Sequence, residues 1–538
     1  MKRKKYLTSL ITGALAVSVL LSGCKDKEAS TEADKESKDN LNNTNMPIVK
    51  EKIELDGFAA KFFSSQDWDK LMLWKEYEKM TNIHINWETV STEAVTEKRN
   101  LMLASGEYPD LLFAAAVPKS DLIKYGQQGV FLPLNDLIDK YAPNLKKIME
   151  ENPIVKQGIT MADGNIYGFP AYYDPNFKGL RIGTPWIQKD WLNKLGLEEP
   201  KTWDELYDVL KKFKEGDPNG NGQADEIPLG ASFSIDQIID FLKGSVGLNN
   251  HGASNVHIDL DPKEDKLRFQ PTSKEYKELL TFLNKLYTEG LIDKEVFTPD
   301  STKFNAVAAK GVYGVLPEID PKTLLNLDGY VGLPVIEGPH GDRINTAIGS
   351  PLGNVGMFVI TDKNENPEAT VRWIDHFYSE EGIKMFFMGF EGVTYTEKNG
   401  EFQYTDEITK NPDGLNLDQA ISKYLTWPGG YYPGVVKEKF FQGAEGSEAT
   451  LENAEKAEPL TLKQDEIWPN FNFTVDESNE LSALSTDIKT YVTEMTANFI
   501  TGKKSIDEWN NYVKTLEKMG LERFMEINDA AYKRYKDK

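Results

Sequence analysis

Hydrophobic and polar residues follow helical and strand periods from the start of the folded region. Residues 68–80 have the apolar spacing of an amphipathic helix, and residues 83–87 alternate as on a half-buried strand. A second helix is predicted over 93–104 and a short buried strand over 110–115. Helices that alternate with apolar strands predict an α/β protein with a parallel sheet covered by helices on both faces.

Helical signals return in the second half of the chain. Pro367 suits the first turn of a helix, and Ser505 to Glu508 form a capping box before another. A further helix is predicted over 521–535. Residues 442–458 are polar and predict a surface excursion, and no internal repeat is visible.

The amino terminus has the pattern of a secretory signal peptide. A basic head, Met1 to Lys5, precedes the uncharged run from Leu7 to Leu21, and small residues lead to Cys24. An ordinary membrane span needs about 20 apolar residues, so this run is too short to be one. Cys24 is the only cysteine of the chain.

The segment after Cys24 predicts a solvated tether. Residues 25–46 contain ten charged residues and no aromatic residue, glycine or proline, so they cannot bury a core. The folded part then runs from 47 to 538, which is 538 − 46 = 492 residues. At about 150 residues per domain this is about three domains, although large two-lobed folds share that length.

Composition and charge narrow the function classes. Hydrophobic residues make up 40% of the chain, with 10 Trp, 23 Tyr and 26 Phe, so a well-filled core is expected. The formal net charge is −23, which repels phosphate backbones and argues against a nucleic-acid partner. A single cysteine excludes a disulfide framework and cysteine-rich zinc sites.

One polar loop has the pattern of a calcium site. Side-chain oxygens stand at loop positions 1, 3 and 5, a glycine follows at position 6, and such a turn can wrap a hard cation. Pro228 stands at position 12, where an EF-hand has Glu, so carboxylates just before it would have to replace that ligand. The alternative is a polar Asn-Gly turn between a helix and a strand. The predicted Ca²⁺ ligands are Asp217, Asn219, Asn221, Gln223 (through its backbone carbonyl), Asp225 and Glu226.

Catalytic motifs are missing from the sequence. The five histidines form no HExxH pair, and there is no GxSxG elbow or GxxxxGK[ST] phosphate loop. With 85 acidic residues, a glycosidase acid/base pair cannot be argued from spacing.

Leu21-Ser22-Gly23-Cys24 resembles the lipobox of bacterial lipoproteins. The resemblance implies cleavage before Cys24 and acylation of its thiol, so that the protein works outside the cytoplasm while tied to a membrane. Together with the charged tether, it suggests the outer face of a Gram-positive cell membrane. The alternative is a plain secreted protein with an incidental cysteine.

Five phrases resemble the extracellular solute-binding proteins of ABC importers that take up sugars. The most specific is 189–206, which contains Pro-Lys-Thr-Trp-Asp-Glu-Leu, and the others lie at 103–113, 163–170, 389–395 and 499–504. The last two are similar to the large lipoprotein branch that includes alginate-binding proteins. The resemblance implies two α/β lobes that close over a ligand by hinge motion, and a partnership with importer permease subunits. The calcium loop is similar to one in the alginate-binding relatives.

The resemblance also implies a division of the chain. The signal peptide would be 1–23 and the acylated cysteine with its tether 24–46. The amino-terminal lobe would be 47–168 plus 357–395, and the carboxy-terminal lobe 169–356 plus 396–538. Crossings between lobes are expected near 168–173, 356–361 and 392–396.

A sugar site needs flat aromatic faces against the ring and polar groups for its hydroxyls. Trp427 and Tyr432 are the first choice, because Pro and Gly place them in a loop. For each single aromatic residue the alternative is ordinary core packing. The further candidates are Tyr431, Trp186, Tyr172, Tyr173, Asp174, Arg181, Glu318, Trp468 and Trp68.

These patterns lead to a lipid-anchored, monomeric receptor that captures an oligosaccharide and is not an enzyme. Two alternatives stay open. One is an oligopeptide receptor of the same class, and the other is a cell-surface glycoside hydrolase or polysaccharide lyase.

Overall fold

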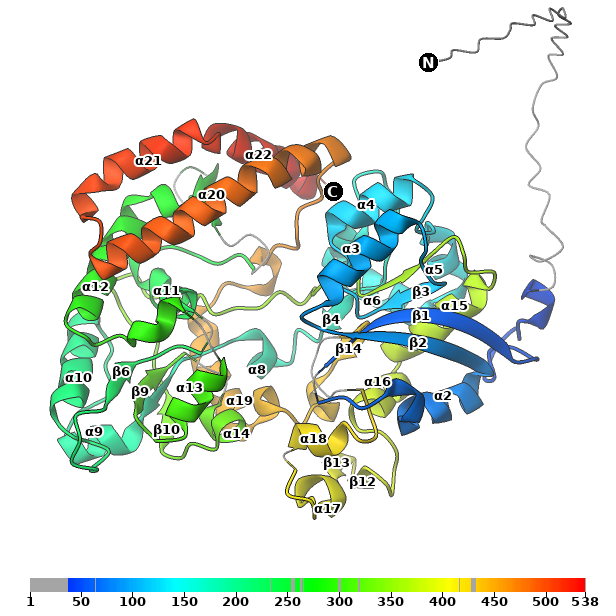
Figure 1. Ribbon diagram of the computed structural model, residues 1–538, viewed down its shortest axis with the longest axis horizontal. Coiled ribbons are helices and arrows are strands. Elements are labelled where there is room, and N and C mark those ends of the chain that lie inside the picture. Colours follow the sequence, from blue (N-terminus) through cyan, green and yellow to red (C-terminus); the bar gives the residue numbers. More distant parts are fainter. Residues whose placement is uncertain are drawn as a thin grey trace, which may run out of the picture.

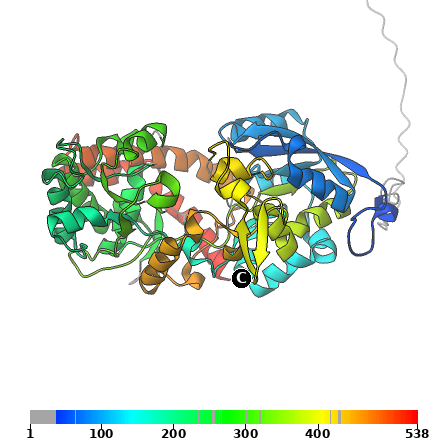
Figure 2. The same ribbon diagram turned by 90° about the horizontal axis from the view of Figure 1, so that it is seen from below.

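The computed structural model shows two lobes that lie side by side (Figures 1 and 2). It describes residues 37–537, with gaps at 63, 233, 253–256, 262–263, 265, 299–300, 318–319, 416 and 427–431. Within these described residues, no helix is both long and apolar enough to cross a membrane.

The first lobe is built on a four-stranded sheet with the order β11-β3-β1-β2. Strands β1 (Ile53–Lys61), β2 (Ile83–Ser91) and β3 (Leu111–Phe113) are parallel, and β11 (Phe358–Ile360) is antiparallel to β3. This confirms the parallel arrangement that the alternating pattern predicts for 83–87 and 110–115. The helices of this lobe are α2 (Met72–Thr81), α3 (Val95–Ser105), α4 (Lys119–Gln127), α5 (Asn135–Tyr141), α6 (Pro143–Glu151), α7 (Pro153–Ile159), α15 (Pro367–Asp375), α16 (Glu380–Phe387), α17 (Asp406–Thr409) and α18 (Leu417–Ile421).

The second lobe has a mixed sheet with the order β10-β5-β9-β6. Strand β6 (Ile227–Leu229) is parallel to β9 (Tyr313–Leu316), while β5 (Trp186–Gln188) is antiparallel to β9 and to β10 (Tyr330–Gly332). A hairpin joins β7 (Ile258–Asp261) and β8 (Lys266–Phe269). The helices are α9 (Lys189–Leu195), α10 (Trp203–Glu215), α11 (Ile235–Leu242), α12 (Lys274–Thr288), α13 (Ser301–Ala308), α14 (Pro321–Leu325), α20 (Val475–Thr501), α21 (Trp509–Lys518) and α22 (Leu521–Lys536).

Each lobe buries its own hydrophobic core. The core of the first lobe takes its buried residues from 48–177 and 352–441, and that of the second from 187–336 and 468–531. Helices α8 (Lys178–Arg181) and α19 (Glu448–Ala457) pack on each other between these two cores. Because the two cores are separate, the lobes are distinct packing units joined by short segments.

The boundary expected at 395/396 is wrong. Residues 396–441 belong to the first lobe, because Phe402, Tyr404 and Phe440 are buried in its core. The expected crossing near 392–396 is instead the start of a hairpin, β12 (Tyr395–Lys398) with β13 (Glu401–Tyr404). The chain leaves the first lobe only after Phe441, and its polar continuation forms α19 rather than an irregular excursion.

Three segments meet where the chain passes between lobes. Strand β4 (Ala171–Tyr173) pairs with β14 (Gly434–Val436) on one side and bonds to 351–354 on the other. The crossing expected near 168–173 therefore lies at this ribbon. The one expected near 356–361 lies earlier, at 348–354, because 358–360 is already β11 in the sheet of the first lobe.

Residues 37–46, which the sequence assigns to the tether, pack against the first lobe. The Ser37 hydroxyl and Asn366 Oδ1 are 3.0 Å apart, and the Arg372 guanidinium donates to the carbonyls of Asn42 and Asn45. Leu41 forms a bridge with Val49. The composition of the segment does not predict this contact, because its backbone carbonyls accept most of the hydrogen bonds. Its charged side chains therefore need not be buried.

A buried carboxylate joins α15 to α6. Asp375 is 3% exposed, and its oxygens accept from the backbone N–H groups of Asn144 (3.1 Å) and Leu145 (2.9 Å). Burial raises the pKa of Asp375 to about 6, against the opposing effect of these hydrogen bonds. An N–H pair at a helix start is left without intrahelical partners, so this carboxylate caps α6.

We expect Asp375 to make the first lobe more stable as pH falls through 6. Its folded pKa lies above the usual value of 3.8, so the folded state holds a proton that the unfolded chain releases, and the stabilisation fades as pH rises through 6. Relative to Asp375→Asn, the parent's free energy of unfolding should rise by about 1 kcal/mol between pH 7 and pH 5. Urea unfolding of both proteins at the two pH values measures this difference, and a constant difference would contradict the assignment.

Candidate functional site

The carboxyl ends of the parallel strands in the first lobe meet beside the crossing ribbon. Ala114 and Val117, which follow β3, donate backbone hydrogen bonds to the carbonyls of Met357 (2.7 Å) and Gly356 (2.9 Å). Residues 356 and 357 come directly after the crossing segment 351–354. In open α/β sheets ligands bind outside the carboxyl ends of the strands, so this edge is the candidate site of the first lobe.

The corresponding edge of the second lobe also reaches a crossing segment. β6 and β9 end at Leu229 and Leu316, and α11 starts shortly after β6. The Thr346 hydroxyl donates to the carbonyl of Asp240 at the end of α11, and Asn250 Nδ2 donates to the Thr346 carbonyl at 2.9 Å. Thr346 precedes the crossing at 348–354. Leu316, the last residue of β9, pairs with Trp186 of β5, and Ile182 just before β5 bridges Ile348 in the crossing, so both carboxyl edges adjoin the same junction.

A second contact holds the lobes together near these edges. Lys119 Nζ, at the start of α4, donates to the carbonyl of Asn470 (2.6 Å) and to Asn472 Oδ1 (2.7 Å). Asn472 Nδ2 in turn donates to the carbonyls of Gln157 and Thr160 in the first lobe. The segment before α20 is therefore fastened to the first lobe while α20 itself packs on α12 in the second.

The loop after β3 has an unusual backbone. Ala114 and Ala116 have φ of +51° and +46°, a region that alanine rarely adopts and that costs about 1–3 kcal/mol per residue. Arg99 on α3 is 4% exposed, and its Nη1 donates to the carbonyls of Ala115 (2.7 Å) and Ala116 (2.8 Å). Such strained residues gather at ligand sites, where the surrounding structure maintains them.

The predicted residues Tyr172, Tyr173 and Asp174 lie at the ribbon. Tyr172 and Tyr173 form β4, with Tyr172 buried and Tyr173 half-buried. Burial raises the pKa of Tyr172. Asp174 Oδ1 accepts from the backbone N–H and the side chain of Asn176 at 2.9 and 3.0 Å, which closes a turn. These residues shape the junction, and their contact with a ligand stays a prediction.

Four predicted aromatic residues are buried. Tyr432 is 1% exposed, stacks on Phe386 at 3.9 Å between ring centroids, and its hydroxyl donates to the Val435 carbonyl. Trp68 and Trp468 are also buried, and Trp468 stacks on His251 at 4.0 Å. Trp186 lies on β5, is 3% exposed and lines a pocket of the second lobe. Tyr432, Trp68 and Trp468 pack in the hydrophobic cores, and contact of the four residues with a ligand stays a prediction.

The remaining predicted residues divide into two groups. Arg181 pairs with Glu458 at 3.3 Å between α8 and the end of α19, and burial lowers its pKa against the effect of that carboxylate. It joins two connecting segments and is not placed at a strand edge. Cys24, Glu318, Trp427 and Tyr431 lie outside the described residues, so their roles stay predictions.

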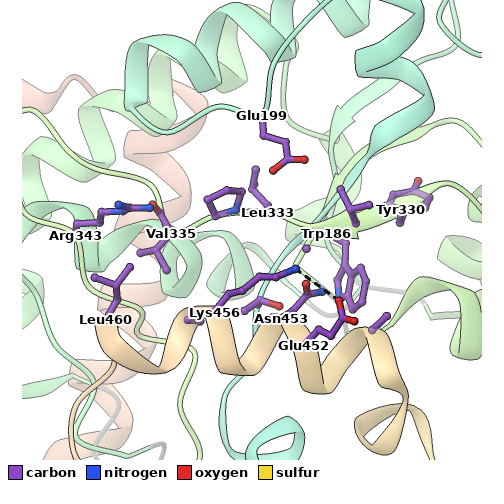
Figure 3. Close-up of a pocket in the computed structure, with 16 residues that line it drawn as sticks. Trp186, Glu199, Tyr330, Leu333, Val335, Arg343, Glu452, Asn453, Lys456 and Leu460 are labelled. Atoms are coloured by element: carbon purple, nitrogen blue, oxygen red, sulfur yellow. Dashed lines mark hydrogen bonds and ion pairs between the residues drawn. The ribbon is translucent and has the colours of Figure 1, made fainter.

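A pocket of about 490 Å³ lies within the second lobe, between β10 and α19 (Figure 3). Asn453 of α19 covers Gly332 so closely that a Cβ there would come within 2.2 Å of its carboxamide. Lys456 and Glu452 form an ion pair across one turn of the helix, at 3.7 Å. Trp186 lines this pocket and pairs with Leu316, the last residue of β9, so the pocket adjoins the carboxyl edge of the second-lobe sheet.

The predicted calcium loop joins α10 to the amino end of β6. Asp217 Oδ1 accepts from the N–H groups of Gly220 (2.9 Å) and Asn221 (3.1 Å), and Asn219 Nδ2 donates to Asp225 Oδ1 at 2.9 Å. Gly220 and Gly222 have positive φ, as the tight turn requires. Among the described residues no group of three or more His, Cys, Asp and Glu is spaced to hold a metal ion.

One observation nevertheless suits a cation in this loop. Both carboxylate oxygens of Glu226 are buried, and neither has a hydrogen-bond partner in the described part of the chain. A buried carboxylate without a partner is costly. Side-chain oxygens of Asp217, Asn219, Asn221 and Asp225 lie in the same loop, which is the ligand type that Ca²⁺ takes.

No sequence motif marks the strand edges themselves. Arg99, the three alanines and the residues after β6 carry no motif, and a buried arginine is not visible in a helix pattern. The usable signal was position, because the alanines directly follow β3 and the residues before α11 directly follow β6. Applying that rule to the strand expected at 110–115 would have pointed to the loop after β3.

Comparison with known proteins agrees with this architecture. FusA, a fructooligosaccharide ABC transporter substrate-binding protein of Streptococcus pneumoniae, is 31% identical over 99% of both chains. Its structure in complex with kestose has a TM-score of 0.76 at 29% identity and covers 90% of this chain and 100% of that chain; the structure of a FusA EF-hand mutant gives 0.74. The alginate-binding protein AlgQ2, solved without calcium ion, gives a TM-score of 0.73 at 26% identity and covers 90% of this chain and 99% of that one.

The family defined as bacterial extracellular solute-binding proteins matches residues 64–384. This range includes β2, β3 and β11 of the first-lobe sheet, β4 of the crossing ribbon and the whole second-lobe sheet. The two lobes, the shared junction and the relatives of the same length all agree with that match. The chain therefore belongs to the bacterial extracellular solute-binding protein family.

Proposed function

We propose that this protein is a receptor that binds an oligosaccharide between its lobes and delivers it to the permease of an ABC importer. The observation that carries the proposal is that the carboxyl edges of both sheets adjoin one hydrogen-bonded junction. Ligand contacts from both edges would favour a closed arrangement of the lobes, and the change in shape would report the bound state to the permease. The relatedness to FusA supports an oligosaccharide as the ligand.

The charges near the edges favour a neutral sugar over a uronate. Glu93 follows β2, and Asp236 lies on the helix that follows β6, whereas Asp240 on that helix is paired with Lys243 at 2.6 Å. Lys119 is committed to the lobe contact. With a net charge of −23 as well, an acidic chain such as alginate would meet repulsion. We therefore favour a fructo-oligosaccharide, the ligand named for FusA.

The residues at this junction suit a protein that binds a sugar and does not cleave it. The strand edges combine backbone groups, alanines and scattered acids, and no nucleophile with an adjacent base is found there among the described residues. An oligopeptide receptor and a polysaccharide-degrading enzyme remain the two alternatives, and neither has a feature of the chain in its favour.

The amino terminus supplies the membrane link in this proposal. Acylated Cys24 would anchor the receptor to the outer face of a cell membrane, in the Gram-positive manner. Only twelve residues separate Cys24 from Ser37, where the chain contacts the first lobe. The anchor would thus be tied to the first lobe, and a single chain would work as a monomer.

Calcium would occupy the loop 217–226 as a structural ion. Asp217, Asn219, Asn221, Asp225 and Glu226 would supply side-chain oxygens and Gln223 its carbonyl. The loop precedes the amino end of β6, whereas the candidate ligand edge is at the carboxyl end of the same strand. The ion would therefore stabilise the second lobe without touching the ligand.

The ligand is tested by titration of the chain from Lys25 onward with kestose, an alginate oligomer and an oligopeptide. Kestose at 100 times its dissociation constant should add about 2.7 kcal/mol to the free energy of unfolding. Calorimetry and thermal melting measure binding, and X-ray scattering should show a smaller radius of gyration with the sugar. Binding of the peptide alone would favour the oligopeptide receptor, and new reducing ends in the sugar sample would favour an enzyme.

Cys24→Ser should release the protein from the membrane into the medium, because the thiol that carries the lipid is lost. Fractionation of cells that express the parent and the variant measures this. Ser22→Ala serves as the control, since it changes a neighbouring residue without removing the thiol. A variant that stays in the membrane fraction would contradict the anchor.

Glu226→Gln should weaken calcium binding at least tenfold, because it removes the charge of the buried carboxylate. Calorimetric titration of the metal-free protein with Ca²⁺ gives the affinity. EDTA should lower the melting temperature of the parent and leave that of the variant nearly unchanged. Glu215→Gln is the matched control, because Glu215 is an exposed residue at the end of α10. Equal calcium affinity in all three proteins would contradict a calcium site in this loop.

A further inference from the structure

In the loop Ala114–Val117 some backbone N–H and carbonyl groups have hydrogen-bond partners and others do not. Arg99 occupies the carbonyls of Ala115 and Ala116, while the N–H groups of Ala114 and Val117 donate to the Met357 and Gly356 carbonyls. The N–H groups of Ala115 and Ala116 have no partner among the described residues. The loop therefore has two N–H donors left over at these positions, while Arg99 uses one lone pair of each carbonyl.

A buried donor without a partner is rare in folded proteins. Ala115 is buried and Ala116 is half-buried, so the Ala116 N–H is the more accessible of the two. Both lie at the carboxyl edge where ligands of such sheets bind. An arrangement of this kind suits an oxygen with free lone pairs, as in a sugar hydroxyl, ring or glycosidic oxygen.

Arg99 makes further contacts beside the loop. Its charge opposes the effect of burial, which raises the pKa of the Asp121 carboxyl. Besides the two carbonyls, Nε and Nη2 donate to Asn100 Oδ1 at 3.3 and 3.1 Å. Nη1 therefore binds the loop while the other two nitrogens bind Asn100, and the single ammonium of a lysine cannot fix its orientation in this way.

We propose that Arg99 is a positioning residue for ligand binding: it holds the loop in the shape, left-handed at Ala114 and Ala116, in which the two remaining N–H groups can donate to sugar oxygens. The inference rests on the proposed function. Holding the loop before the ligand arrives reduces the ordering that binding would otherwise require, and so strengthens binding.

Replacement of the arginine tests the positioning role. Arg99→Met and Arg99→Lys should each raise the dissociation constant for kestose at least tenfold, with Lys the milder change. Lys98→Met is the matched control, because it removes a cation from an exposed neighbour on the same helix. Unchanged kestose affinity in both Arg99 variants would overturn the proposal.

A variant that removes the backbone strain at Ala116 separates an effect on ligand affinity from an effect on stability. Ala116→Gly accepts positive φ without penalty, so its melting temperature should be equal to or above that of the parent. Its dissociation constant for kestose should nevertheless rise severalfold, because the loop is no longer held in one shape. Opposite directions for stability and affinity support preorganisation, and parental affinity in Ala116→Gly contradicts it.

Hydrogen exchange separates this proposal from the proposed function. Without any sugar, the amides of Ala114 and Val117 should exchange faster in Arg99→Met than in the parent or in Lys98→Met. If the parent binds no kestose but this difference is seen, the choice of ligand fails while the role of Arg99 in holding the loop stands. If exchange is the same in all three proteins, Arg99 does not hold the loop and the proposal fails.

Discussion

The backbone hydrogen bonds of β4 determine how the two halves of this molecule relate. On one side β4 pairs with β14, and on the other it bonds to residues 351–354, so three segments far apart in sequence meet in one ribbon. β4 leads toward the second lobe, whereas 351–354 comes from the second lobe and leads to β11 of the first. Since the hydrophobic cores on either side are separate, this ribbon and the contact at Lys119 and Asn472 carry much of the connection. If one lobe moves relative to the other, the chain has to bend at this ribbon.

The position of the junction explains why both sheets can serve one ligand. Parallel strands end at a common edge, and the loops that follow them are free to carry polar groups. In the first lobe that edge leads through Ala114 and Val117 to the crossing segment, and in the second it leads through α11 and Thr346. The same geometry separates the calcium loop from the ligand, because that loop stands at the opposite end of β6.

Two loops of this protein use positive φ for different purposes. In the calcium loop Gly220 and Gly222 adopt it where the turn is tight, and Asp217 also adopts it while its carboxylate accepts from backbone N–H groups of the same loop. After β3 it is alanine that adopts it, and a buried arginine holds the shape. Glycine makes a turn possible at low cost, whereas alanine in this conformation needs outside support. The shape of the loop after β3 is therefore maintained by a specific contact, the one with Arg99.

The sequence by itself determined the local elements and the class of protein. Period-2 and period-3.6 patterns predicted β2, α3 and β3 to within a few residues, because those strands and helices bury one face, and the family phrases implied two lobes. The tertiary structure alone decided which aromatic residues are core, since Tyr432 and Trp468 differ from a ligand platform only in what stacks on them. It also decided that 396–441 stays in the first lobe and that Arg99 meets a loop sixteen residues away. Burial and long-range hydrogen bonds depend on how distant segments pack, and a pattern read along the chain contains no record of that packing.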